Sequence, residues 1–176
     1  MHHEQWDGRV LAVHATSKGI GYAVFEGPQS PIDWGVTSVG AGEKNTKCLA
    51  LVQELVGRFC PDVLVLEDVG AKSSRRSERV RRLYRSIETF AGSRAIEIHR
   101  YSRADLRRCF DEGFGASRKP EIAQTLATLL PELAHRIPPV RKLWQSEDVR
   151  MGIFDAAALA YTFFRYDAAP DEDAGE

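Results

Sequence analysis

The chain has 176 residues, of which 43% are hydrophobic and 28% are charged, and its net charge is −1. This length predicts a single domain that buries its own core, and the composition excludes collagen-like, disulfide-stapled and wholly disordered proteins. No apolar run approaches the ~20 residues of a membrane span, and neither a signal peptide nor a membrane contact is expected. Three widely separated cysteines are typical of reduced thiols in a cytoplasmic protein.

The first part of the chain predicts three strands, a helix and a fourth strand. Apolar runs bounded by turn residues predict strands over residues 10–14, 21–26 and 34–39, and their short links predict an antiparallel meander. Apolar residues at helical spacing predict a helix over 45–59. A fully apolar strand follows over 63–66, and the intervening crossover predicts that this strand is parallel to its neighbour.

The remaining elements are mainly helices. A basic helix is predicted over 77–91 with Ser77 as its N-cap. It is followed by a strand (95–100), a short helix (103–110), a glycine-rich loop (113–117), a helix (120–130), a loop (131–146) and a last helix (147–164). Residues 1–8 are expected to be an extension, 9–165 the domain, and 166–176 an acidic disordered tail. This order predicts an α/β fold, the ribonuclease H-like mixed five-stranded sheet with helices on both faces.

The small net charge conceals an uneven distribution. Residues 71–108 hold twelve Lys and Arg side chains against four acids, so this segment carries +8 and the rest of the chain −9. Eleven of the twelve are arginine, which suits bidentate contact with phosphate. A solvated helix face is the structural alternative, but the charge density favours a nucleic acid partner. The candidate phosphate contacts are Lys72, Arg75, Arg76, Arg79, Arg82, Arg118 and Lys119.

Two carboxylates occupy positions where burial is costly. Glu67 ends an all-apolar strand and should lie beside His14, because the first and fourth strands are expected to be parallel neighbours. Asp155 lies among apolar and small residues of the last helix, two turns after Asp148 and on the same face. The structural alternatives are a solvated loop residue for Glu67 and an ion pair with a core arginine for Asp155. Carboxylates gathered from two strands and one helix are typical of sites that hold two Mg²⁺ ions for phosphodiester hydrolysis.

Four segments, in this order, resemble the RuvC-type Holliday junction resolvases of the ribonuclease H-like superfamily. Residues 11–24 are similar to the first hairpin of that family, 61–69 to the motif whose Glu is a metal ligand, 113–119 to the glycine-rich turn ending in a functional Lys, and 155–160 to the terminal Asp-Ala-Leu helix. The resemblance implies a Mg²⁺-dependent endonuclease that cleaves branched DNA during recombination and repair, as a cytoplasmic homodimer without a nucleotide cofactor.

Three positions depart from this resemblance. His14 stands where the first catalytic Asp is expected, Gly152 where an acid or His is expected, and Gly70 where an aromatic side chain often contacts bases. A neutral imidazole offers one nitrogen to an ion and favours Mn²⁺ over Mg²⁺. The metal ligands that the resemblance implies are therefore Glu67 and Asp155, with His14 as an atypical ligand and Asp148 or Glu147 as a compensating acid.

Three function classes fit these residues. The first is a metal-dependent endonuclease with Glu67, Asp155 and His14 in the catalytic site and Lys119 on the scissile phosphate. The second is a nucleic-acid-binding protein that has lost hydrolysis through His14. The third is a phosphate-handling enzyme or scaffold without DNA, against which the basic segment argues. The two costly carboxylates favour the first class, whereas the charge pattern leaves junctions, flaps, single strands and RNA open as substrates.

Overall fold

A five-stranded sheet runs through the middle of the molecule in the computed structural model, which describes residues 6–72 and 74–168. The strand order is β3-β2-β1-β4-β5. β1 pairs antiparallel with β2, as does β2 with β3, whereas β4 is parallel to both β1 and β5. The predicted meander, the parallel crossover and the five-stranded α/β architecture are confirmed. The strands are β1 (Val10–Ala15), β2 (Gly19–Phe25), β3 (Pro31–Ser38), β4 (Val63–Glu67) and β5 (Glu97–Tyr101).

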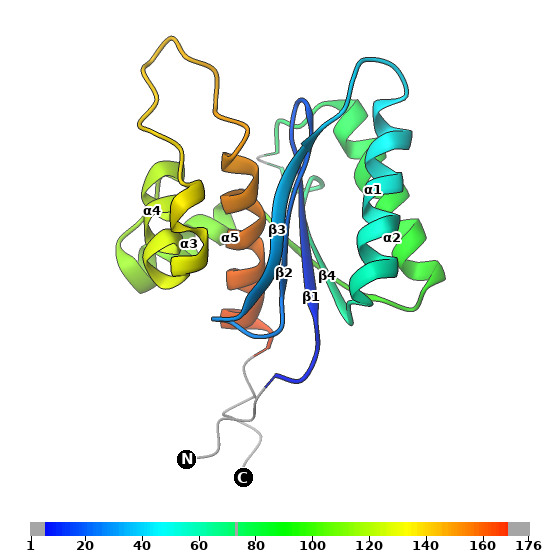
Figure 1. The fold of residues 1–176 in the computed structure, drawn as a ribbon, viewed down its shortest axis with the longest axis horizontal. Helices are drawn as coiled ribbons and strands as arrows, with labels where there is room; N and C mark the ends of the chain where they lie inside the picture. The colour runs from blue at the N-terminus through cyan, green and yellow to red at the C-terminus, as the bar shows by residue number, and fades with distance from the viewer. Residues whose placement is uncertain (1–5, 73, 169–176) are drawn as a thin grey trace.

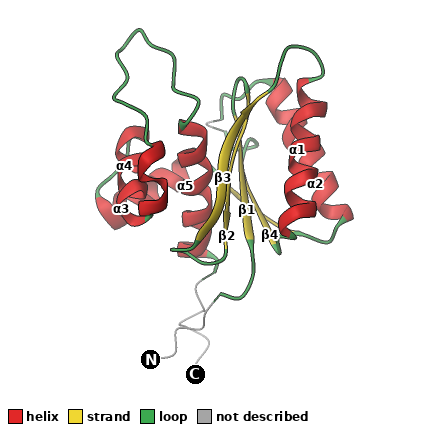
Figure 2. Cartoon of the chain, viewed as in Figure 1, coloured by secondary structure: helices red, strands yellow, loops and turns green. Residues whose placement is uncertain are grey.

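Helices cover both faces of this sheet (Figures 1 and 2). Two helices lie on one face and α5 lies on the other, with two further helices packed outside it. Because side chains alternate along a strand, Leu11 and Val13 of β1 belong to one apolar cluster, while Val10 and Ala12 belong to the other. The helices are α1 (Lys44–Phe59) and α2 (Glu78–Ser93) on the first face, and α3 (Arg103–Phe114), α4 (Lys119–Leu129) and α5 (Met151–Tyr166) on the second.

Several predicted boundaries are wrong. α3 continues to Phe114, and Gly115, at a φ of 65°, ends it, so the first two residues of the predicted glycine-rich loop belong to the helix. The predicted loop over 131–146 begins with a 3-10 helix, Pro131–Arg136, because Leu133 inserts into the core. The last helix starts at Met151 rather than at residue 147, and it continues to Tyr166, inside the predicted tail.

The two ends of the described chain meet beside α5. Trp6, from the predicted N-terminal extension, packs edge-on against Phe163 and Phe164, with ring centroids 5.4 and 6.1 Å apart. Asp167 accepts a hydrogen bond from the hydroxyl of Tyr101. The rest of the predicted extension and tail, residues 1–5 and 169–176, lies outside the described residues. None of the described helices combines the length and apolar character that crossing a bilayer requires.

Candidate functional site

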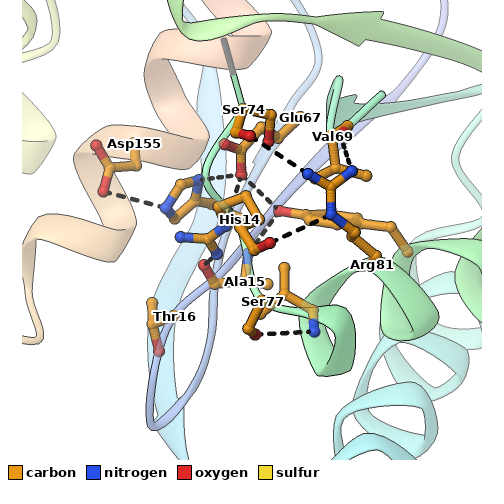
Figure 3. Close-up of polar contacts among 12 residues, drawn as sticks. His14, Ala15, Thr16, Glu67, Val69, Ser74, Ser77, Arg81 and Asp155 are labelled. Carbon is orange, nitrogen blue, oxygen red and sulfur yellow. Dashed lines mark hydrogen bonds and ion pairs between the residues drawn. The ribbon is translucent and has the colours of Figure 1, made fainter. Parts of the chain in front are cut away.

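The ends of β1 and β4 place His14 beside Glu67. The parallel register aligns Val13 with Leu66, so the next residue of each strand emerges at the same edge of the sheet. His14 Nδ1 lies 3.9 Å from Glu67 Oε2, and His14 Nε2 lies 3.4 Å from Asp155 Oδ2 of α5. Figure 3 shows the imidazole ring between the two carboxylates. Three residues that the sequence analysis singled out are therefore neighbours in the fold.

Each carboxylate of this site also contacts a cation. Arg76 Nε lies 3.4 Å from Glu67 Oε2, and Lys119 Nζ lies 3.2 Å from Asp155 Oδ2. The side chains of Glu67 and Asp155 are only 16% and 13% exposed, so these cations replace much of the water that would otherwise solvate them. Two negative charges are thus compensated by two positive charges inside the site.

The proton-carrying groups around His14 are held neutral. Burial lowers the pKa of His14, an effect that the carboxylates of Asp155 and Glu67 oppose and the cations Arg76 and Lys119 reinforce. The hydroxyl of Tyr84 accepts a hydrogen bond from the N–H of Ala15 at 2.8 Å and donates to Glu67 at 3.4 Å. Burial raises the pKa of Tyr84, so this hydroxyl keeps its proton. At neutral pH the site therefore presents a neutral imidazole between two carboxylates.

These residues open onto a pocket of about 570 Å³. Beside three acids, Glu67, Asp68 and Asp155, five cations line it, and this excess of positive charge favours an anionic ligand. Two of the cations, Arg103 and Arg107, were not among the predicted site residues. Their spacing of four residues places them on one face of α3, and this spacing could have identified them from the sequence as phosphate contacts. The lining cations are Arg75, Arg76, Arg103, Arg107 and Lys119.

The acids expected to complete a metal centre do not join the cluster. α5 begins three residues after Asp148, so this residue does not share a helical face with Asp155. Instead, the Asp148 carboxylate accepts hydrogen bonds from Arg150 at 2.7 and 2.9 Å, which lowers the pKa of Asp148 to about 2. Glu147 contacts Lys119 Nζ at 3.0 Å and is linked to Asp155 through that ammonium group.

The donor set of the pocket does not fit a two-ion centre. Within residues 6–72 and 74–168, no three His, Cys, Asp or Glu side chains lie close enough together to hold a metal ion. The imidazole of His14 lies between Glu67 and Asp155, and each of these carboxylates faces a cation. Two ions that share bridging carboxylates need more oxygen donors than this arrangement supplies.

Close packing of α5 on the sheet explains why position 152 is a glycine. α5 crosses β2 so closely that a Cβ on Gly21 would lie 2.2 Å from the carbonyl oxygen of Gly152. A Cβ on Gly152 itself would lie 3.1 Å from Val36 Cγ1 and 3.2 Å from Thr16 Cγ2. An acidic side chain at this position would therefore meet β3 and the β1–β2 turn. The contact between the two glycines brings α5, and with it Asp155, onto the sheet.

The predicted phosphate contacts lie in different environments. Arg75 and Arg76 precede α2, whereas Arg79 and Arg82 lie on it. Arg79 is half-buried and donates to Asn45 Oδ1 at 3.1 Å and to the carbonyl of Thr16 at 3.2 Å, which ties α2 to the β1–β2 turn. Lys72, Arg75, Arg82 and Arg118 are exposed, the last two beside Glu78 and Glu121.

Solved structures that are similar to this chain include Holliday junction resolvases. Thermus thermophilus RuvC in complex with a Holliday junction substrate is 15% identical over 90% of this chain and 94% of its own, with a TM-score of 0.63. The yeast mitochondrial Holliday junction resolvase Ydc2 is 15% identical over 93% and 80% of the two chains, with a TM-score of 0.66. The fowlpox virus Holliday junction resolvase is 12% identical over 89% and 97%, with a TM-score of 0.52.

Comparison of the sequence alone finds no relative among family models or curated proteins. The likeness to the resolvases lies in the arrangement of the strands and helices over nearly the whole chain. The resemblance noted in the sequence is thereby confirmed at the level of structure, and the chain has the ribonuclease H-like fold of the RuvC-type Holliday junction resolvases.

Proposed function

We propose that this protein is an endonuclease that binds branched DNA of the Holliday-junction kind and acts on the backbone in the pocket around His14. The observation that carries the proposal is the convergence of Glu67 and Asp155, from β4 and α5, on one pocket lined by five cations. The solved neighbours support it, because one is bound to a Holliday junction substrate and others are junction resolvases.

The cations of the pocket would attract and position the DNA backbone. The exposed side chains of Arg75, Arg103 and Arg107 form part of the pocket lining and would neutralise phosphates as DNA approaches. Arg76 and Lys119 lie deeper, against Glu67 and Asp155, and would contact the phosphate that enters the pocket. The Mg²⁺ requirement and the preference for Mn²⁺ stay predictions, and no step of this proposal depends on them.

A second function is binding of branched DNA without cleavage. His14 in place of an acid, and the pairing of Glu67 with Arg76 and of Asp155 with Lys119, favour it. In this case the pocket would hold the backbone through its cations alone. The homodimer and the cytoplasmic location that the resemblance implies also stay predictions, and sedimentation velocity of the purified protein tests the first of them.

The two functions are separated by a binding and cleavage assay on one synthetic four-way junction and its matched linear duplex. We expect the wild type to prefer the junction in EDTA and to cut it in at least one of three conditions, without added metal, with Mg²⁺ or with Mn²⁺, so that the predicted metal requirement is tested separately. E67Q and D155N should lose cleavage and bind as tightly or more tightly, because a negative charge facing phosphate is removed. D148N is the matched control, since Asp148 is bonded to Arg150 outside the pocket, and it should cut like the wild type.

Binding without cleavage in any of these conditions would support the second function. Cleavage that survives in both E67Q and D155N would remove the pocket from the proposal. A wild-type protein that binds junction and duplex equally would contradict both functions. Thermal unfolding of each variant, measured alongside, identifies a loss of activity that comes from loss of fold.

A further inference from the structure

The loop between the 3-10 helix and α5 has an exposed apolar tip. Within residues 137–150, Val140, Leu143 and Trp144 are 95%, 100% and 80% exposed. Figure 1 shows this loop projecting from the end of the molecule at which the β1–β2 turn and the start of α5 also lie. Large apolar side chains grouped in this way on a protein surface are typical of a contact with a partner.

The tip has a defined turn. The carbonyl of Lys142 accepts a hydrogen bond from the N–H of Gln145 at 3.0 Å, and the N–H of Lys142 donates to Gln145 Oε1, also at 3.0 Å. Leu143 and Trp144 are therefore the two central residues of the turn. Lys142 Nζ lies 5.3 Å from the centroid of the Trp144 ring. The indole is thus presented outward beside a cation.

Both ends of the loop are anchored, and one end lies at the pocket. Leu133 of the 3-10 helix is fully buried, and Pro138 and Pro139 then restrict the backbone toward the tip. At the other end, Glu147 contacts Lys119 Nζ at 3.0 Å, and Lys119 is part of the pocket lining. The loop therefore leaves the core at Leu133 and returns to the edge of the pocket at Glu147.

The charge beside the tip indicates the partner. Arg141 and Lys142 precede Leu143 and Trp144, and residues 137–146 contain no acid. An aromatic face beside cations is a combination with which proteins bind unpaired or unstacked bases, since the ring stacks and the cations contact the backbone. A linear duplex offers no exposed base face to such a ring, whereas a branch point interrupts the stacking of bases.

We propose that Trp144 stacks on a base at the branch point of the DNA whose backbone lies in the pocket, while Arg141 and Lys142 contact the adjacent phosphates. This inference rests on the proposed binding of branched DNA. In this arrangement the loop distinguishes branched from linear DNA, and the pocket makes the backbone contacts that both kinds of DNA share.

The test measures binding of the full-length protein, in EDTA, to a four-way junction that carries 2-aminopurine at the branch point, and to the matched duplex. W144A should bind the junction about 5- to 100-fold more weakly than the wild type and the duplex nearly equally, because one stacking contact is lost. The wild type should change the 2-aminopurine fluorescence, and W144A should not. W144Y, which keeps an aromatic face, should restore most of the affinity. L143A is the matched control and should bind like the wild type.

An affinity of W144A for the junction equal to that of the wild type overturns the inference. If R103A/R107A loses affinity in the same experiment, the proposed function nevertheless stands. An equal loss for junction and duplex also overturns it, because Trp144 would then not recognise the branch. A change of W144A from dimer to monomer, with junction affinity retained, would assign the tip to a second copy of the chain instead. A wild type without preference for the junction overturns both proposals.

Discussion

The side chain of His14 is nearly buried, yet it lies between two carboxylates. Its side chain is 14% exposed, and each of its ring nitrogens faces a carboxylate. A protonated imidazole would gain from these carboxylates, but burial outweighs them and lowers the pKa of His14, with Arg76 and Lys119 acting in the same direction. The group is therefore held neutral by its surroundings, and this has a consequence for stability.

We predict that the wild type loses stability as the pH falls below about 6.5. The unfolded chain, in which His14 has its ordinary pKa, binds a proton more readily than the folded chain, so protons favour unfolding in this range. Each unit by which the pKa is lowered contributes about 1.4 kcal/mol. Urea unfolding at about pH 7 and about pH 5 measures the loss, which should be smaller in H14N because Asn does not titrate. Equal losses in the two proteins would show that other groups cause the pH dependence.

The Gly21–Gly152 contact is the feature of α5 that determines its distance from the sheet. A methyl group on Gly21 would meet a backbone carbonyl at 2.2 Å, which no side-chain rotation relieves. A methyl group on Gly152 would lie 3.1 and 3.2 Å from the side-chain ends of Val36 and Thr16 and 3.3 Å from the Cα of Gly21, which are much milder overlaps than 2.2 Å. Adding a methyl group should therefore destabilise the fold more at Gly21 than at Gly152, although the two glycines touch each other.

We expect G21A to lose about 3 kcal/mol of unfolding free energy and G152A about 1 kcal/mol or less. Because α5 also carries Asp155, G21A should weaken cleavage or binding in the pocket, whereas G152A should leave both nearly unchanged. Denaturant unfolding and the junction assay measure the two effects. Similar losses in both variants would show that the helix adjusts its position freely and that the contact does not set its distance.

The strand pairing and the starts of most helices, such as the Ser77 N-cap of α2, could be predicted from the sequence, but the start of α5 and its distance from the sheet could not. Short links between strands 1, 2 and 3 leave only antiparallel pairing, and the 45–59 crossover leaves only a parallel fourth strand. The start of α5 depends on the Asp148–Arg150 pair, and its approach to the sheet depends on a contact with Gly21, 131 residues earlier in the chain. Tertiary contacts determine where this helix starts and how closely it packs, and the hydrophobic periodicity of the sequence carries no information about them.

At the scale of the whole molecule, the basic segment divides into arginines that hold the fold and arginines that face solvent. Arg81 donates to the carbonyls of Val69 and Ser74 and stabilises the segment between β4 and α2, whereas Arg79 donates to the carbonyl of Thr16 and ties α2 to the β1–β2 turn. The sequence predicted the excess charge and the neighbourhood of His14, Glu67 and Asp155. It did not distinguish inward from outward arginines, because their order along the chain is compatible with both.

This division predicts different effects of two similar substitutions on DNA binding. R75A should lower the slope of log affinity against log salt by about one, because one exposed phosphate contact is lost. R79A should lower the melting temperature and leave the slope unchanged at temperatures where the variant is folded. Binding titrations at several salt concentrations, with unfolding curves for both variants, measure this. An equal drop in slope would place Arg79 on the DNA surface.

The long separation in sequence between β1, at the centre of the sheet, and α5, which covers it, affects folding during synthesis. β1 is made well before α5, yet Val10 and Ala12 are covered only when this helix packs on them. Until residues 151–166 are released, one apolar face of the growing sheet stays open to solvent and to other nascent chains. The fold is therefore complete only after residues 151–166 have been released, and the chain depends most on chaperones in the interval before that point.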